Sequence, residues 1–139
     1  MLYGAECWAV TQHAEEILAT TQRRMERLMV GATLLDRKSN EWLRGVTKVK
    51  DVVDEARKRK ARWAWNIARM DNDRWAKIIT EWCPRYKKRP LGRPRTRWRD
   101  SITKKLKTQR WLAKARRESK QYWIDTLGAP YVTYRKANK

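Results

Sequence analysis

Apolar side chains recur every three or four residues along most of the chain, which is the spacing of amphipathic helices. The first such run covers about residues 11–30 and ends near Gly31. Its apolar or small positions are Ala14, Ile17, Leu18, Thr21, Met25, Leu28 and Met29. A short second helix begins after Ser39, which can cap it, and runs through Leu43 to Gly45. The pattern therefore predicts two helices before residue 50.

A longer helix is predicted from Asp51 to about Met70. One of its faces carries Val52, Ala56, Trp63, Ile67 and Met70. Arg59 and Lys60 interrupt this face, and Trp65 points almost opposite Trp63 because successive helical residues are about 100° apart. We therefore interpret Trp65 as an aromatic side chain that lies off the core face.

Residues 71–82 predict a further turn or two of helix, capped by Asp71 or Asp73 and stopped by Pro84. The apolar side chains of this segment are Trp75, Ile78, Ile79 and Trp82. Beyond it, the prolines at 84, 90 and 94 together with Gly92 indicate an extended loop.

Two more helices are predicted after the loop. The first covers about residues 96–106 and carries Trp98, Ile102 and Leu106. The second covers 110–127 and carries Trp111, Ala115 and Tyr122, flanked by Trp123. Gly128 and Pro130 end it, because glycine favours the residue after a helix and proline cannot continue one.

These elements predict an all-α fold of five or six amphipathic helices, in two small helical units joined by the loop rich in proline, glycine and arginine. We divide the chain into a helical region at 1–56, a basic helical region at 57–83, the loop at 84–95, a C-terminal helical region at 96–130 and a frayed tail at 131–139. Apolar residues make up 41% of the chain, which favours folded helices over disorder. The side chains expected on inner faces are Trp63, Trp75, Trp98 and Trp111.

Charge divides the chain unevenly. Residues 1–56 carry eight Lys and Arg against nine Asp and Glu, whereas residues 57–139 carry 27 against six. Segment 84–117 alone has 15 cations and a single acid, Asp100. With a net charge of +20, the chain is expected to bind a polyanion through its second part.

The residues that catalysis or metal binding would need are scarce. The chain has two cysteines, Cys7 and Cys83, and one histidine, His13, so it cannot build a four-ligand zinc site or a disulfide framework by itself. Asp71, Asp73 and Glu81 could be imagined as a metal site, but helix capping is the preferred interpretation. We expect no catalytic set, no cofactor, no small-molecule substrate and no membrane span, and an intracellular location.

Several phrases in a fixed order carry a resemblance to a known family. They are "LYGAECW" from Leu2, "RRMERLMVG" up to Gly31, "DRKSNEWLR" from Asp36, "VKDVV" from Val49, "RWAWNIARM" from Arg62, "DRW" from Asp73 and "GRPRTRWRD" from Gly92. Together they resemble the C-terminal part of the endonuclease and reverse transcriptase polyprotein of RTE-like non-LTR (LINE) retrotransposons, from about residue 2 to 131.

The resemblance implies that residues 1–56 end the polymerase thumb and that the rest is a basic C-terminal extension. The palm, with its catalytic aspartates, would precede Met1, and the apolar stripe of the first helix would be partly exposed without it. The chain departs from the family at Trp65 and Asn66, where many relatives have Gly and His, and at Ser101, where an Asp is usual. Any metal or proton role of that His is therefore lost here.

The candidate site is a set of cations expected to contact RNA or DNA phosphates with little sequence preference, within a nuclear or cytoplasmic ribonucleoprotein. They are Arg57, Lys58, Arg62, Arg85, Lys87, Lys88, Arg89, Arg93, Arg95, Arg97 and Arg99. Trp65 is the candidate for stacking on an unpaired base, with packing between helices as the alternative.

Other interpretations stay open. The "GRPR" of the loop fits an AT-hook that enters the minor groove, although Leu91 stands where that motif has a cation, and the loop could also be a plain solvated connector. "RKRKARW" could be a nuclear localisation signal. The whole chain could instead be a protein-interaction module retained by a host, or a cationic amphipathic protein that acts on anionic membranes.

Overall fold

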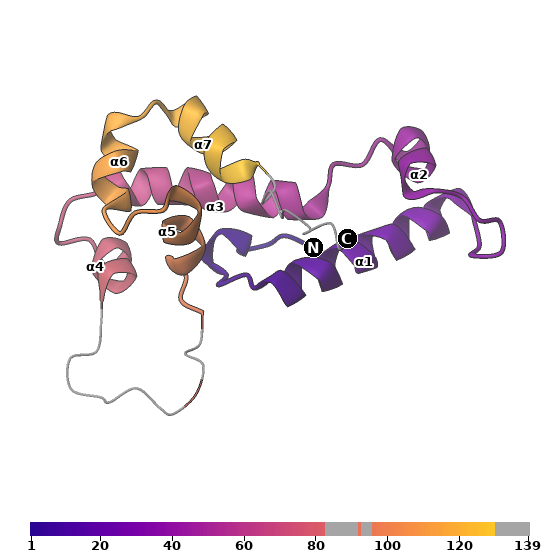
Figure 1. Ribbon diagram of the computed structural model, residues 1–139, viewed down its shortest axis with the longest axis horizontal. Coiled ribbons are helices and arrows are strands. Elements are labelled where there is room, and N and C mark those ends of the chain that lie inside the picture. Colours follow the sequence, from indigo (N-terminus) through magenta and orange to yellow (C-terminus); the bar gives the residue numbers. More distant parts are fainter. Residues whose placement is uncertain (83–91, 93–95, 130–139) are drawn as a thin grey trace, which may run out of the picture.

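The computed structural model describes residues 1–82, 92 and 96–129, and every regular element within those ranges is helical (Figure 1). The elements are η1 (Ala5–Cys7), a short 3-10 helix, and the α-helices α1 (Gln12–Val30), α2 (Asn40–Thr47), α3 (Val52–Arg69), α4 (Trp75–Glu81), α5 (Asp100–Leu106), α6 (Trp111–Arg117) and α7 (Lys120–Gly128). The predicted all-α class is confirmed. The frayed tail and nearly all of the proline loop lie outside the described residues.

The first three α-helices begin where sequence signals place them, and α2 continues to Thr47, beyond the predicted end at Gly45. Thr11 Oγ1 accepts a hydrogen bond from Ala14 N at the start of α1, and Gly31 closes the helix at a φ of 70°. Ser39 caps α2 in the same way. Asp51 accepts two backbone N–H groups at the start of α3. Side-chain capping therefore fixes where these helices start.

Two predictions near the later helices are wrong. Neither Asp71 nor Asp73 caps α4, because Arg74 occupies the cap position and makes no side-chain cap bond. The predicted helix at 110–127 is two helices, since the backbone at Glu118 is extended and Ser119 caps α7 through Tyr122 N.

The break at Glu118 also changes which aromatic residue enters the core. Trp123 is 1% exposed and its Nε1 donates to Ala61 O at 2.9 Å, whereas Tyr122 is 54% exposed. The predicted continuous helix at 110–127 would place Tyr122 on the inner face, with Trp123 beside it. The interruption between α6 and α7 redirects the second helix, so its buried face is set by contact with α3.

The main core forms around α3, which runs through the middle of the molecule with α6 and α7 along one side and α5 near the other (Figure 1). Small residues of α3, Ala61, Ala64 and Ala68, let these helices approach closely. The remaining core side chains are Ile67, Ile102, Trp111, Ala115, Trp123, Ile124 and Leu127. The core thus combines residues from both sides of segment 83–95, and the charge boundary at residue 56 falls within continuous α3.

Two arginines fasten α3 to α6 in a reciprocal way. Arg69 donates to the carbonyls of Ala115, Arg116 and Glu118 at the C-terminal end of α6, at 2.9 to 3.3 Å. Arg116 Nε donates to Ala68 O near the end of α3 at 2.6 Å. Each guanidinium therefore satisfies carbonyl groups that a helix leaves without partners at its C-terminus.

The N-terminal segment packs against α3 and α5 through polar contacts. Trp98 Nε1 donates to Glu6 O at 2.6 Å, and Lys60 Nζ donates to Trp8 O at 3.2 Å. Gln22 of α1 donates to Lys50 O and accepts from Val52 N, which holds α1 to the start of α3. Beyond this contact α1 and α2 form an arm that extends from the body (Figure 1).

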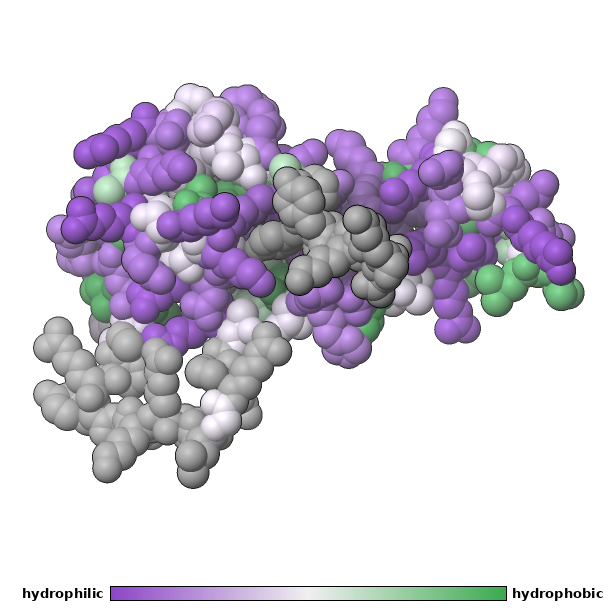
Figure 2. Space-filling model, viewed as in Figure 1, coloured by the Kyte–Doolittle hydropathy of each residue, from purple (hydrophilic) through white to green (hydrophobic). Residues whose placement is uncertain are grey.

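Two helices bury polar side chains and expose apolar ones. On α1, Gln22 and Glu26 are buried. The exposed apolar side chains of α1 are Ile17, Met25, Leu28 and Met29, followed in the next turn by Leu34 and Leu35. Figure 2 shows hydrophobic side chains gathered at the end of the arm. Trp75 of α4, expected on an inner face, is exposed as well, so that prediction is wrong.

Candidate nucleic-acid interface

The cations predicted on α3 differ in what they contact. Arg57 donates to both carboxylate oxygens of Glu15, at 3.0 and 2.5 Å, and lies 3.6 Å from Asp54. Because the pair is mostly buried between α1 and α3, Arg57 serves the contact between these helices. Lys58 is half-buried, with its Cγ against Gly128, and Arg62 is exposed, 3.5 Å from Glu55. Of these three, Arg62 faces solvent most directly.

Trp65, the predicted stacking residue, is enclosed by other side chains. The Arg69 guanidinium lies 3.4 Å from the centre of its ring and Lys120 Nζ lies 5.4 Å away. The indole packs against the core, and its Nε1 is buried without a hydrogen-bond partner among the described residues. A base could stack on the Arg69 side only if Arg69 gave up its carbonyl contacts with α6. The geometry thus favours the alternative, packing between helices.

The loop cations predicted to contact phosphates fall mostly outside the described residues. Those not described are Arg85, Lys87, Lys88, Arg89, Arg93 and Arg95. Arg97 and Arg99 are described, and both are half-buried at the start of α5, where Arg97 N donates to Asp100 Oδ2 at 2.7 Å. The AT-hook interpretation of "GRPR" likewise concerns residues that are almost all outside the described part.

A set of cations on α5 and α6 was missing from the predicted site. Residues 101–117 contain seven Lys and Arg and no acid. Two of the seven are used internally, since Lys105 donates to the carbonyls of Leu127 and Ala129 and Arg116 donates to Ala68 O. The other five form no ion pair with a described residue, and we call them the α5–α6 basic face: Lys104, Lys107, Arg110, Lys114 and Arg117.

The sequence carried a signal for this face. Arg110, Lys114 and Arg117 are spaced by four and three residues, so they share one side of a helix. They are part of the strongly basic segment 84–117, but its composition alone does not distinguish cations on one helix side from the others. The sequence does not show which of the seven cations are used internally. Lys105 and Arg116 donate to carbonyl groups of α7 and α3, which are distant from them in sequence.

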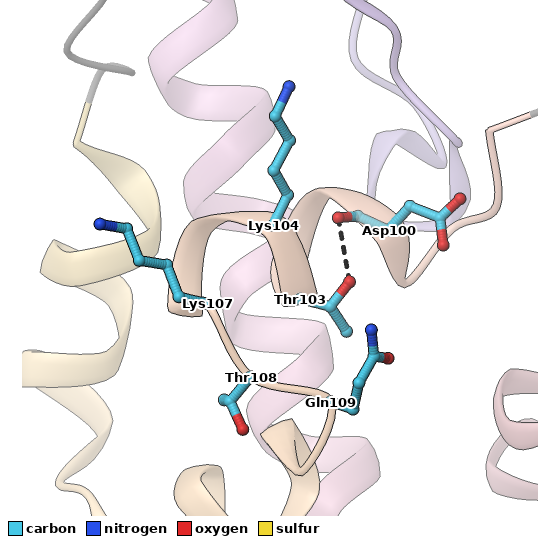
Figure 3. Close-up of a pocket in the computed structure, with 6 residues that line it drawn as sticks. All are labelled: Asp100, Thr103, Lys104, Lys107, Thr108 and Gln109. Atoms are coloured by element: carbon cyan, nitrogen blue, oxygen red, sulfur yellow. Dashed lines mark hydrogen bonds between the residues drawn. The ribbon is translucent and has the colours of Figure 1, made fainter.

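A shallow hollow of about 440 Å³ lies beside α5 within this face (Figure 3). It is lined by Asp100, Thr103, Lys104, Lys107, Thr108 and Gln109. Thr103 Oγ1 donates to Asp100 O at 3.2 Å, and Figure 3 shows Lys104 and Lys107 extending away from each other. Its hydroxyl, amide and ammonium groups are of the kind that bind phosphate and sugar oxygens, whereas the Asp100 carboxylate repels an anion.

Lys60 is a buried cation behind this region. Its Nζ donates to Trp8 O and lies 5.1 Å from the centre of the Trp98 ring. Burial lowers the pKa of Lys60 to about 8, and the negative charges of Asp100 and Glu15 oppose that shift. Lys60 therefore links η1, α3 and α5 and is not available to an external ligand.

The described ranges hold neither a metal-ligand cluster nor a membrane-spanning helix. Among residues 1–82, 92 and 96–129, no three His, Cys, Asp or Glu side chains gather as a metal site would require. In that part of the chain, no helix is both long and apolar enough to span a bilayer.

Comparison with known proteins supports a transposon-related origin. The chain is 34% identical over 113 residues to an uncharacterized transposon-derived protein of Caenorhabditis elegans, a match that covers 78% of this chain and 40% of that protein. The chain thus spans less than half the length of this relative. No protein-family model matches the chain, and no solved structure matches it significantly. The transposon relationship implied by the sequence is therefore supported at a coarser level than the retrotransposon family.

Proposed function

We propose that this chain is the non-catalytic, nucleic-acid-binding C-terminal part of a non-LTR retrotransposon reverse transcriptase. The α5–α6 basic face would contact RNA or DNA phosphates during target-primed reverse transcription by the intact protein, inside a ribonucleoprotein particle. The observation that carries the proposal is the set of five cations on α5 and α6 that have no acidic partner among the described residues. The transposon-derived relative supports a transposon-related origin, within which the retrotransposon assignment is our proposal.

Phosphate binding by such a face is driven by counterion release. Each phosphate that a Lys or Arg neutralises releases condensed cations from the nucleic acid, so the affinity falls as salt rises. If all five cations make contact, the slope of log affinity against log salt on duplex DNA should be about −4.5. Contacts to phosphates carry no base information, so we expect similar affinity for unrelated sequences.

The arm formed by α1 and α2 supports the place of the chain within a longer protein. The exposed apolar side chains on α1 and in the turn after it are clustered, and soluble proteins usually cover surfaces of this kind with a partner. We propose that the polymerase domain preceding this segment covers them in the intact protein. The catalytic aspartates would then belong to that domain, and the present chain would act in binding alone.

The test compares two variants with the same net charge. In the first, the five cations of the α5–α6 basic face are replaced by Gln. In the second, five cations of the nearly neutral N-terminal part are replaced by Gln: Arg23, Arg24, Arg37, Lys48 and Lys50. Binding of a labelled RNA hairpin and a DNA duplex is measured by fluorescence anisotropy across a salt series.

The first variant should lose most of the salt dependence and bind at least tenfold more weakly at low salt, while the second should stay within about threefold of the parent chain. Equal losses in both variants would show that net charge alone, and no particular face, attracts nucleic acid. A parent chain with a flat salt response would overturn the proposal altogether.

A further inference from the structure

Helix α4 presents its apolar side to solvent and its lysine to the protein. Trp75 is 76% exposed, Ile79 66% and Trp82 65%, whereas Lys77 is only 3% exposed. This is the reverse of an ordinary surface helix, in which the apolar stripe faces the core. Leaving a large apolar side chain in water forgoes on the order of 2 kcal/mol of burial energy. Such an arrangement indicates a surface that meets a partner.

The orientation of α4 is fixed by the buried lysine. Lys77 Nζ donates to Met70 O at 2.9 Å and to Asn72 Oδ1 at 2.7 Å, and Met70 is the residue that ends α3. These charge-assisted bonds hold one side of α4 against the end of α3. The opposite side, with the two indoles, is therefore directed away from the body.

Trp75 opens α4 and Trp82 follows its last residue as the C-cap, so helical spacing places the two exposed indoles on the same side. Trp75 and Trp82 are seven residues apart, which is close to two helical turns and about 10 Å along the axis. Ile79 lies between them. The distance is about three times the 3.4 Å spacing of nucleotides along one strand of a duplex, so each ring can contact a different base.

Other tryptophans of the C-terminal part are occupied by the protein itself. Trp111 and Trp123 are buried, Trp98 donates to Glu6 O, and Trp65 carries Arg69 on its ring. Among the described residues from 57 onward, Trp75 and Trp82 are the indoles with large exposed rings.

The charge of α4 and its preceding turn is mixed, and the sequence that follows is strongly positive. Arg74 immediately precedes the helix, and Arg116 of α6 binds Ala68 O near the end of α3. The acids of α4 and its preceding turn are Asp71, Asp73 and Glu81, and Glu81 lies off the side that carries the two indoles. After Trp82 the sequence continues with six cations and no acid before residue 96.

We propose that α4 is a stacking platform for unpaired bases of single-stranded nucleic acid, with Trp75 and Trp82 as the stacking residues. The inference rests on the proposed function, since the nearby cations must hold the phosphates while the indoles take the bases. Single-stranded nucleic acid offers both exposed base faces and phosphates, whereas duplex DNA hides its base faces within the stack. The platform therefore selects single strands over duplexes, while the α5–α6 basic face binds either.

The experiment uses the full chain and three variants, Trp75→Leu/Trp82→Leu, Trp75→Phe/Trp82→Phe and Trp42→Leu. Leu keeps an apolar side chain but removes the aromatic face, Phe keeps a smaller face, and Trp42 is a partly exposed indole of α2 that serves as the control. Affinity is measured by anisotropy for a uridine homopolymer and a DNA duplex, each of about 20 units, a length that exceeds a typical single-strand site of ~4–16 nucleotides.

We expect the Leu double variant to lose at least tenfold affinity for the homopolymer and less than twofold for the duplex, with the Phe variant in between and Trp42→Leu unchanged. Equal single-strand affinity for parent and Leu variant would overturn the inference while leaving the proposed function intact, provided that the parent binds with a steep salt response. A parent that binds neither nucleic acid would overturn both. Binding to phosphatidylcholine vesicles that contain phosphatidylserine is measured as well. If the Leu double variant loses vesicle binding but keeps its affinity for the homopolymer, the inference is overturned and α4 is assigned to a lipid surface.

Discussion

The body around α3 and the two helices α1 and α4 follow opposite rules of burial. In the body, Ala, Ile, Leu and Trp side chains from α3, α5, α6 and α7 are buried together, and most cations lie on the surface. On α1 and α4, Gln22, Glu26 and Lys77 are buried and the apolar side chains are exposed. The body is therefore arranged as a folding core, whereas the two inverted helices leave apolar surface uncovered, and we propose them as contact surfaces.

The two kinds of region are also held by different forces. The body is stabilised by apolar burial, which grows with area and has no preferred direction. The inverted helices are held by a few directed polar bonds, those of Gln22 to Lys50 and Val52, of Arg57 to Glu15, and of Lys77 to Met70. Directed bonds can fix a helix while leaving its apolar side free for another molecule.

The largest expected effect contrasts a core tryptophan with an exposed one. Trp123→Ala should lower the free energy of unfolding by about 3–5 kcal/mol, because it opens a cavity and leaves Ala61 O without its indole donor. Trp75→Ala should change it by less than about 0.5 kcal/mol. Urea denaturation followed by circular dichroism measures both. A comparable loss for Trp75→Ala would mean that α4 buries its apolar side in solution.

The next effect depends on pH and concerns Lys60. The pKa of Lys60 falls from 10.5 to about 8 in the folded chain because of burial, so the unfolded chain binds more protons between those values. The free energy of unfolding should thus rise as pH increases through this window, by up to roughly 3 kcal/mol, and the cost of burying the charge should be fully present below pH 8.

The control for this pH effect is Lys60→Met, which keeps the stem and removes the charge. It should abolish most of the rise, and a smaller part should remain because burial also lowers the pKa of Lys105. Stability is read from urea titrations at several pH values from 7 to about 10.5. The same slope in the parent and in Lys60→Met would show that Lys60 keeps its ordinary pKa and is not buried with its charge.

A smaller effect tests the polar attachment of α1. Gln22→Ala removes the partner of both Lys50 O and Val52 N, one acceptor and one donor near the start of α3. Leaving such groups unsatisfied should cost about 1–3 kcal/mol. Gln12→Ala is the control, because Gln12 makes a single exposed bond to Glu16. Amide hydrogen exchange should show faster opening of α1 in Gln22→Ala only, and equal exchange in both variants would contradict the attachment.

The smallest effect uses two glycines with opposite surroundings. A Cβ at Gly128 of α7 would lie 2.9 Å from Lys58 Cγ, whereas a Cβ at Gly45 of α2 would meet nothing within 4 Å. Gly128→Ala should therefore destabilise the chain by about 1 kcal/mol through crowding, and Gly45→Ala should stabilise it by up to about 1 kcal/mol through helix propensity. Thermal denaturation of both variants gives the signs, and the same sign in both would contradict the contact between α7 and α3.

The helix pattern of the first half of the chain was predictable because its signals are local. Thr11, Ser39 and Asp51 lie at the starts of helices, and Gly31 lies at an end, and each acts on backbone groups within a few residues. The break at Glu118 was missed because apolar spacing on both sides of it resembles one continuous helix. The cap at Ser119 was visible in the sequence, but a serine within a helix is common enough to be passed over.

The basic character of the candidate site was predictable from the sequence, but the residues that belong to it were predicted less well. The concentration of cations after residue 57 is a property of composition, and it pointed to a polyanion without any structure. Arg57 could not be assigned from the sequence, because its partner Glu15 lies 42 residues away on another helix. The same holds for Trp65, whose ring is covered by Arg69 only because α6 packs beside α3.

The sequence by itself determined where the first three α-helices form and how they begin, and that the second part of the chain is strongly basic. Only the tertiary structure decided which side of each helix is buried, which cations stay free on α5 and α6, and that Trp75 and Trp82 face outward while Trp123 faces inward. The physical reason is that helical spacing and capping arise within a few residues of the backbone. Burial depends on which distant helices pack together, and a helix with both polar and apolar anchors can pack by either side.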